Sequence, residues 1–465
     1  SDHQMSFSIA SNFLVERSAY SFTFGCLAVS VAIRVLTNGP PISGVFLVSP
    51  RFGGMEMQER YDMTAAGWFD EDLPITYEFT YSSSTLGGTL VDNVVKAKTT
   101  SHQGSSMLPA IGHIENNHTI RVTAIIYDTY SLSVREFAEV QVSPLVLNIA
   151  DTSELISDQL SNSTDTDAVQ QVLAVASSLL NRVDCSGLSH GFCAELNRDN
   201  CSAVSNTCGS CLSGYGIGVL GPHNTKCSST AVAFTMESDS SCPCANPFQS
   251  CVSGVCENNV MGCTNNCSSH GSCHYLNKNT GVELDEVCYE GDVGCKSVCR
   301  CVDDYNGKDC SINNADLVNL QSARESLVDS LVAISSENAS VSTLASWSTN
   351  LAGITQDPTQ LSVSAVGKAA SMLSTIVESV KDSPDSSAAC SDGVFSSINS
   401  IISAGGGMDD AVLELLNTFS AGLGASTEFS GVIYDAFRVG SGASGSGSIS
   451  NPLSEQPLQC PHPVI

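Results

Sequence analysis

The chain has 465 residues, and its 48 Asp and Glu against 19 Lys and Arg give a formal net charge of −29 at pH 7. This charge excludes nucleic-acid binding, because neutralising phosphates takes clustered Lys and Arg, and it disfavours anionic membrane surfaces for the same reason. Charged residues make up only 14% of the chain and hydrophobic residues 42%, which excludes a disordered acidic tail. At roughly 100–200 residues per domain, the length predicts three or four domains.

Residues 1 to about 150 predict β-structure, because their apolar residues alternate or form short β-branched runs between turn residues. The spacing of these runs, with no helical periodicity between them, predicts an antiparallel β-sandwich of the Ig, PKD or fibronectin type. The expected strands are residues 20–24, 27–33, 44–48, 75–81, 119–127 and 137–142.

Helical periodicity follows. An apolar stripe over residues 168–180 lies behind Thr and Asp residues that can cap a helix. After Cys310, further stripes predict about five helices in a small antiparallel bundle. Since helical segments lie on both sides of the cysteines, we expect residues 152–182 to pack with the later helices and the cysteine block to be an insertion. The later stripes are residues 317–334, 344–351, 366–380, 394–402 and 408–416.

The cysteines indicate the compartment, because eighteen of the 21 lie between Cys185 and Cys310. Only one CxxC pair, Cys208 with Cys211, is present, and no second pair completes the four ligands of a zinc site. We therefore expect disulfides and an extracellular or cell-surface location. Cys390 and Cys460 are expected to pair and to restrain the Gly/Ser-rich linker at residues 440–448.

The chain shows no targeting segment. Its first residues lack the basic and apolar regions of a signal peptide, and we expect a processed product or part of a longer chain. The most apolar run, residues 27–36, is interrupted by Arg34 and falls short of the ~20 residues that a bilayer requires. The sequence therefore predicts no membrane span in this segment.

The last part of the cysteine block resembles an EGF-like domain. Its closing sequence, CRCVDDYNGKDC at residues 299–310, matches the second half of that family, with Gly307 at the terminal turn. The resemblance implies three pairings, which are Cys263–Cys273, Cys267–Cys299 and Cys301–Cys310. An insertion carries Cys288 and Cys295, which are expected to bond to each other. Residues 258–262 lack the acidic residues of the calcium-binding subtype, so we predict no calcium site there.

Upstream, six cysteines form a second unit that resembles a small cysteine knot of the EGF or plexin–semaphorin–integrin sort. Four more cysteines follow, and the three pairings that four cysteines allow all stay open. The six are Cys185, Cys193, Cys201, Cys208, Cys211 and Cys227, and the four are Cys242, Cys244, Cys251 and Cys256.

The β-rich part resembles the receptor-for-egg-jelly (REJ) module. The similarity rests on NGPPISGVFLVSP at residues 38–50, GWFDEDLPITYEF at residues 67–79 and VTAIIYD at residues 122–128. It covers residues 38–150, and residues 315–424 loosely resemble the helical part found downstream of such modules. The resemblance implies an extracellular segment of the kind found in polycystin-1-like and protist surface proteins.

Trp68 is expected to anchor the core of this β-domain, because a large ring buried between sheets is strongly stabilising. The acidic run Asp70-Glu71-Asp72 could hold Ca²⁺, but only three of the usual 6–8 oxygen ligands are in view. We therefore favour a solvated turn over a calcium site.

Residues 1–37 fit the closing strands of a preceding β-module. Cys26 in this segment has no obvious partner, because 21 is an odd number. Its partner could lie upstream, or in another chain, or Cys26 could be a buried free thiol.

Glycans are expected on exposed sequons in an extracellular chain. Asn117 and Asn162 are the best candidates, whereas Asn200 and Asn266 precede cysteines that can hinder modification. The five sequons begin at Asn117, Asn162, Asn200, Asn266 and Asn338.

The sequence thus predicts a multi-domain β + α protein with an antiparallel β-sandwich, a disulfide-rich EGF-like block and a small helical bundle. Its expected segments are residues 1–37, closing strands of a preceding β-module; 38–150, the REJ-type β-sandwich; 151–184, a helix leading into the cysteine block; 185–310, the cysteine block with its EGF-like part at 263–310; 311–430, the Ser-rich helical bundle; and 431–465, a Gly/Ser tail closed by a disulfide.

This organisation predicts a non-catalytic structural or adhesive glycoprotein, a building block of a cell-surface or flagellar filament. Its expected partners are copies of itself or neighbouring modules of a longer chain. The alternative is an ectodomain fragment of a polycystin-like receptor, and a secreted enzyme is a remote alternative. No nucleophile elbow, HExxH helix or P-loop is present, so we predict no catalytic residue, no metal and no cofactor.

Overall fold

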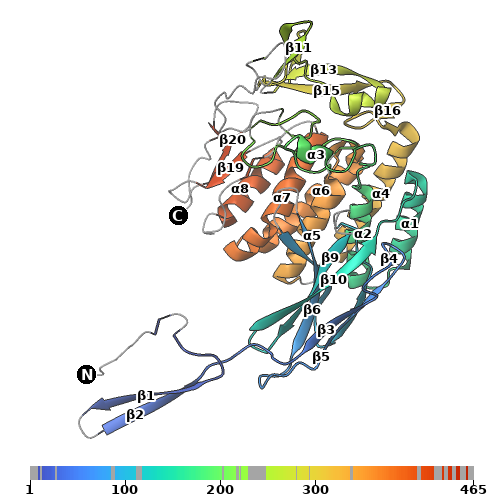
Figure 1. Ribbon diagram of the computed structural model, residues 1–465. Helices are drawn as coiled ribbons and strands as arrows, with labels where there is room; N and C mark the ends of the chain where they lie inside the picture. The colour runs from blue at the N-terminus through green and yellow to red at the C-terminus, as the bar shows by residue number, and fades with distance from the viewer. Residues whose placement is uncertain are drawn as a thin grey trace. The chain divides into compact units, whose positions relative to one another are not determined.

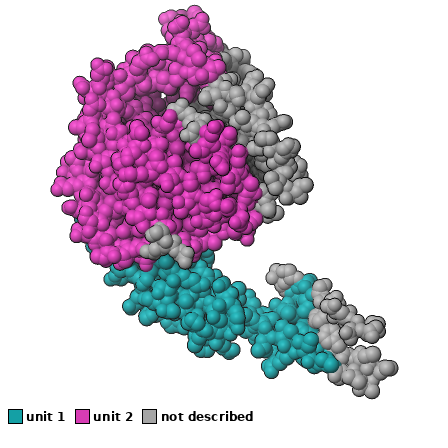
Figure 2. All heavy atoms as spheres, turned by 180° about the vertical axis from the view of Figure 1, so that it is seen from behind, with its two compact units in different colours: residues 1–83, 91–144 teal, residues 84–90, 145–465 magenta. Residues whose placement is uncertain are grey.

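The computed structural model (Figure 1) divides into two compact units, coloured separately in Figure 2. Unit 1 is Ser1–Ser83 with Val91–Pro144, and unit 2 is Ser84–Leu90 with Leu145–Ile465. No described helix is both long enough and apolar enough to cross a membrane. The structure describes residues 9–10, 13–26, 29–84, 90–111, 118–201, 204–215, 219, 221–228, 244, 248–278, 280–292, 294–335, 339–405 and 410–423, and the backbone of strands at 432–433, 438–441, 447–450 and 457–458.

The described residues of unit 1 form three sheets. A two-stranded antiparallel sheet pairs β1 (Ala19–Cys26) with β2 (Val29–Leu36). A three-stranded sheet has the order β3 (Val45–Ser49), β5 (Tyr61–Ala66), β8 (Gln103–Ser106). A five-stranded sheet has the order β4 (Gly54–Met55), β10 (Ser133–Ser143), β9 (Thr119–Tyr127), β6 (Thr76–Ser84), β7 (Leu90–Thr99). The six strands expected from alternation are confirmed as β1, β2, β3, β6, β9 and β10.

The three- and five-stranded sheets contribute to one core. In β5 the buried Tyr61 and Met63 alternate with the exposed Asp62, as a half-buried strand requires. Phe46 of β3 stacks on the fully buried Phe79 of β6, with ring centroids 6.0 Å apart. The inward side chains of both sheets therefore hold unit 1 together.

Trp68 is less buried than the sequence predicts for a core residue. Its ring is only half-buried and lies against Gly44, where a Cβ atom would come within 2.1 Å of the ring. Phe79 of β6, by contrast, is fully buried. Trp68 therefore packs over the backbone of Gly44 and stays partly exposed.

Unit 2 contains seven long helices among its described residues, and α4 to α8 lie alongside one another (Figure 1). Five of the seven begin at a side chain that accepts a hydrogen bond from the backbone N–H three residues on, which satisfies an otherwise unpaired donor. These caps are Asn148, Asp165, Asn313, Ser340 and Ser362. The helices are α1 (Ile149–Asn162), α2 (Thr166–Leu180), α4 (Asn314–Ile334), α5 (Val341–Thr355), α6 (Val363–Val380), α7 (Pro384–Gly405) and α8 (Asp410–Leu423).

Close side-chain packing joins these helices. Phe395 of α7 and Phe419 of α8 are fully buried and meet edge to face, 5.2 Å between centroids. Gly393 of α7 lies against the backbone of Ser348 in α5, where a Cβ atom would come within 2.5 Å of the Ser348 carbonyl carbon. The bundle therefore depends on both large rings and a close backbone approach.

The helices on the two sides of the cysteines pack together, as expected. Arg324 of α4 donates to the Asn181 side chain at 2.8 Å, and Asn181 donates to the carbonyl oxygen of Gly353 at 2.6 Å. Asn181 directly follows α2, so this network joins α2 to α4 and α5. The cysteine block is therefore an insertion between α2 and α4.

The predicted bridge between Cys390 and Cys460 is wrong. Cys390 is a free thiol, fully buried within α7, and it hydrogen-bonds to Ser348 of α5. The α7 helix turns this thiol into the bundle core, away from any surface bond. Cys460 lies outside the described residues.

The tail also departs from a plain linker. Four short strands form one antiparallel sheet where the Gly/Ser composition predicts flexible chain. They are β18 (Val432–Ile433), β19 (Arg438–Ser441), β20 (Gly447–Ser450) and β21 (Pro457–Leu458).

Candidate functional site

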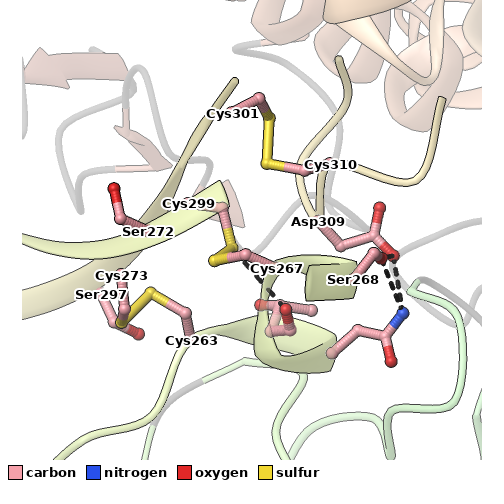
Figure 3. Close-up of a disulfide and its surroundings, with 12 residues drawn as sticks. Cys263, Cys267, Ser268, Ser272, Cys273, Ser297, Cys299, Cys301, Asp309 and Cys310 are labelled. Atoms are coloured by element: carbon pink, nitrogen blue, oxygen red, sulfur yellow. Dashed lines mark hydrogen bonds between the residues drawn. A yellow bond between two sulfur atoms is a disulfide. The ribbon is translucent and has the colours of Figure 1, made fainter. Parts of the chain in front are cut away.

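Eight disulfides of the cysteine block join pairs of described residues. The last part of the block is built on β13 (Gly271–Asn277) and β15 (Cys295–Cys301), whose register places Cys273 opposite Cys299. Its bonds are those implied by the EGF resemblance and by the simplest pairing of the insertion. Figure 3 shows Cys263–Cys273, Cys267–Cys299 and Cys301–Cys310. The fourth bond is Cys288–Cys295.

Asp309 joins the two ends of this part of the block. It is 5% exposed, and its carboxylate accepts hydrogen bonds from Asn265 at 3.1 Å and from Ser311 at 2.7 Å. Asn265 begins four successive residues with φ between 46 and 50°, within the short helix η2 (Thr264–Ser269). Positive φ is unfavourable for residues other than glycine, so Asp309 and the Cys267–Cys299 bond stabilise a turn that would not form alone.

The upstream unit surrounds a buried arginine. Arg198 is 1% exposed and donates to the carbonyl oxygens of Gly209, Val219 and Gly221 at 2.9–3.0 Å, and to that of Thr225. Burial lowers the pKa of Arg198 from its ordinary value. The side chain supplies hydrogen-bond donors to loops that have little regular structure. Three disulfides enclose it, which are Cys185–Cys201, Cys193–Cys208 and Cys211–Cys227.

Three of the four cysteines that follow this unit are among the described residues. Cys244 bonds to Cys256, and Cys251 is also in a disulfide. Cys256 lies on β12 (Val255–Asn258), which pairs with β11 (Gln249–Val252) and places Cys256 opposite Cys251. Cys242 lies outside the described residues.

A series of polar side chains on β13 was not foreseen. The Ser272 hydroxyl lies 2.8 Å from Nε2 of His274, and Nδ1 of His274 lies 2.6 Å from Oε1 of Glu283. Arg300 of β15 donates to the other oxygen of Glu283 at 2.8 Å. The hydrogen bond from His274, then the charge of Arg300, lowers the pKa of Glu283. Ser272 and His274 are two residues apart on one strand, and this spacing is the signal that could have found them.

The acidic run of unit 1 forms a cluster with a distant third residue. Asp70 and Asp72 lie with Asp128, carboxylate oxygens within 4.8 Å of one another, whereas the exposed Glu71 does not join them. Arg17 pairs with the buried Asp70 at 2.8 Å, and Asn38 donates to Asp128.

Backbone groups complete these bonds. Asp70 accepts from the backbone N–H of Asp72 at 2.8 Å, and Asp128 accepts from those of Tyr130 and Leu132 at 2.8 and 2.9 Å. The protein's own donors therefore account for this cluster as two carboxylate-capped turns. A second group that could hold a metal by position, Cys263 with Cys267 and Cys299, is disulfide-bonded and has no free thiolate to offer.

Three of the five sequons can be placed. Asn162 is exposed as the last residue of α1, and Asn200 and Asn266 are exposed within the cysteine block. Asn117 and Asn338 lie outside the described residues, as does the side chain of Cys26.

Comparison with known families gives one match. The family model of the REJ domain matches residues 1–178, which is wider than the 38–150 expected from sequence and runs from β1 into α2. No curated protein matches the chain. REJ domains are extracellular, and the eight disulfides fit the same oxidising surroundings. On this match, residues 1–178 are similar to a REJ domain, an extracellular module of the polycystin-like type.

Proposed function

We propose that the chain is a non-catalytic structural or adhesive segment of an extracellular glycoprotein. The REJ match supports the extracellular class, and the disulfides support a role in which the fold must persist outside the cell. Within this proposal, the two large sheets of unit 1 form an antiparallel β-sandwich, and residues 263–310 form an EGF-like module.

One observation carries the structural role, which is that the cysteine block joins the helical bundle at both of its ends. At the far end, β17 (Ile312–Asn313) runs directly into α4, and the backbone N–H of Asn314 donates to Asp304 at 3.1 Å. The side chain of Asn306 also donates to Asn314, at 2.7 Å. At the near end, the chain enters the block just after Asn181, which donates to the carbonyl oxygen of Gly353 in α5 at 2.6 Å. Such anchored, cross-linked chain resists extension.

Pulling on single molecules tests this role. We expect the oxidised protein to release less chain length on unfolding than protein reduced beforehand, because the disulfides prevent residues 185–310 from extending. Equal lengths in the two states would contradict the proposal. Intact mass after alkylation in urea without reductant is the control, with Cys390 expected to react while the sixteen cysteines of the eight disulfides resist.

This structural role has two versions. The protein is either a building block of a cell-surface or flagellar filament or the ectodomain of a polycystin-like receptor. The REJ match favours the receptor, because REJ modules occur in polycystin-like ectodomains. Antibody labelling of intact cells distinguishes them. Labelling along filaments that detergent does not dissolve supports the first version, and uniform surface labelling extracted by detergent supports the second.

The remote alternative, a secreted hydrolase, has a specific candidate site. Ser272, His274 and Glu283 form the hydroxyl–imidazole–carboxylate series by which hydrolases activate a nucleophile. Ser272 is exposed, however, and Arg300 shares the carboxylate. We expect activated esters to be hydrolysed no faster by the native protein than by Ser272→Ala. A rate that falls at least tenfold in Ser272→Ala would favour the hydrolase.

A further inference from the structure

The β1–β2 hairpin is a sheet of two strands, each paired only with the other among the described residues. Its register places Phe22 opposite Ile33 and Tyr20 opposite Val35. A two-stranded sheet alone is at best marginally stable in water, and further strands or a packed face are needed to stabilise it. The hairpin is eight residues long on each strand, so it offers a substantial surface for such a contact.

The two faces of this hairpin differ in polarity. Alternation places Tyr20, Phe22, Val31, Ile33 and Val35 on one face, which we call the apolar hairpin face. Val31 is 59% exposed and Ile33 is 52% exposed. The opposite face carries Ala19, Ser21, Thr23, Ala32 and Arg34, with the exposed Leu36 at its end as its one large apolar side chain among those described. A partner could therefore cover the apolar face without burying a charge.

No described strand pairs with the outer edges of the hairpin, and these edges differ in charge from another edge in unit 1. Edge strand β7 carries Lys96 and Lys98, and lysines on an edge strand oppose pairing with a further strand. Along β1 and β2 the only charged residue is Arg34. One free edge of unit 1 is thus protected by charge, whereas the hairpin strands carry no lysine and no acidic residue.

Charge also distinguishes the hairpin from the rest of the chain. From Arg17 to Met55 there is no Asp or Glu, and the charged residues are Arg17, Arg34 and Arg51, although the whole chain carries −29. Two copies of so acidic a chain repel each other over most of their surface. They meet without acid–acid repulsion at this segment, which favours a second copy as the occupant.

We propose that the β1–β2 hairpin is a self-association element through which two copies of the chain pair. The apolar hairpin faces pack on each other about a twofold axis, burying Phe22 and Ile33 of both copies. Arg34 points to solvent on the outer side of each copy. This inference extends the structural role proposed above, because paired modules can join longer assemblies.

Sedimentation equilibrium of the whole chain tests the pairing. The Cys26→Ser background is used throughout, so that no bond through that residue can link two copies. We expect a reversible dimer, and Ile33→Lys on the apolar face to weaken it at least tenfold. Ala32→Lys is the matched control, because it adds the same charge one residue away on the opposite face, and it should leave the dimer unchanged.

Other results overturn the proposal. A monomer at every concentration means that something other than a second copy covers the face, and equal weakening by both variants means a general charge effect. Hydrogen exchange of the hairpin amides provides an independent readout that does not depend on a variant. We expect their protection to rise with protein concentration, and protection independent of concentration contradicts pairing. The pulling experiment reports on residues 185–310, so its outcome is separate from this one.

Discussion

Arg324 is a fully buried arginine that meets carbonyl and amide oxygens in place of a carboxylate. It donates to Gln360 at 2.8 and 3.0 Å, to the carbonyl oxygen of Ile354 at 2.6 Å and to Asn181 at 2.8 Å. Burial lowers its pKa to about 10, so the guanidinium stays charged at neutral pH. An apolar stripe in the sequence reveals the core face of α4, but it gives no sign that an arginine belongs there.

Replacing this residue should be costly. We expect Arg324→Leu to lower the free energy of unfolding by about 3–5 kcal/mol, because it leaves several buried acceptors without donors. Urea denaturation followed by the helical circular dichroism signal measures the change. Arg51→Leu, at an exposed site, is the control and should shift stability by less than about 0.5 kcal/mol. Equal effects of the two variants would show that the buried network contributes little.

The lowered pKa of Glu325 predicts that the fold loses stability at acidic pH. Hydrogen bonds from Ser364, Lys368 and Ser362 lower its pKa to about 2. A carboxylate with a depressed pKa in the folded state stabilises the fold above its unfolded pKa, near 4.5, and that contribution is lost as pH falls toward 2. Because the group is partly exposed, we expect a small effect. The urea midpoint of Glu325→Gln should lie below that of the native chain at pH 6 and match it at pH 2, and a pH-independent difference would refute the assignment.

At the scale of elements, two helical glycines make a matched pair. A Cβ atom on Gly393 would meet the Ser348 backbone at 2.5 Å, whereas one on Gly367 in α6 has no neighbour within 4 Å. We expect Gly393→Ala to destabilise by about 1–3 kcal/mol through overpacking of α5 against α7. Gly367→Ala should stabilise by about 0.5–1 kcal/mol through helix propensity alone. The melting temperatures of both variants test this prediction. A higher melting temperature for both variants would contradict a close contact between α5 and α7.

Elements were predictable where an apolar pattern was strong. The six alternating strands and the helical stripes after Cys310 are present, as the sequence predicts. Strand β8 was missed because QGSS has no apolar residue, and β7 was missed because Asp92, Asn93 and the lysines obscure its alternation. The single helix expected over residues 151–184 is two helices, α1 and α2, because Asp165 caps a new helix at Thr166. Where tertiary contacts place a polar segment in a strand or helix, the local sequence pattern gives little indication of that structure.

The candidate site was predictable only in part. The cysteine pairings came from a resemblance, which fixes positions that spacing alone leaves open. Asp128 and Arg17 lie far along the chain from Asp70, so only the fold brings them together. Cys390 was misjudged because cysteine composition gives no information on which way a helix turns its thiol.

At the scale of the whole molecule, the disulfides should differ in their contribution. Cys267–Cys299 joins residues 32 apart in sequence, and Cys288–Cys295 joins residues 7 apart. Because a longer closed loop restricts the unfolded chain more, we expect the double Ser variant of the first pair to lose about 1 kcal/mol more stability than that of the second. Unfolding by guanidinium, followed by Tyr fluorescence of the block, measures both. Equal losses would mean that strain or residual structure outweighs loop length.

The Arg324–Asn181 bond ties together the two helices between which the chain leaves and re-enters the bundle. The helical bundle is therefore complete without the 126 residues of the inserted cysteine block, and we expect this insertion to be replaceable. A gene in which a short Gly/Ser bridge replaces residues 185–310 should still encode a folded bundle. We expect related proteins to differ in the length and content of this insertion while keeping the helical bundle. We also expect the bundle to accept another disulfide-bonded domain engineered in the same place.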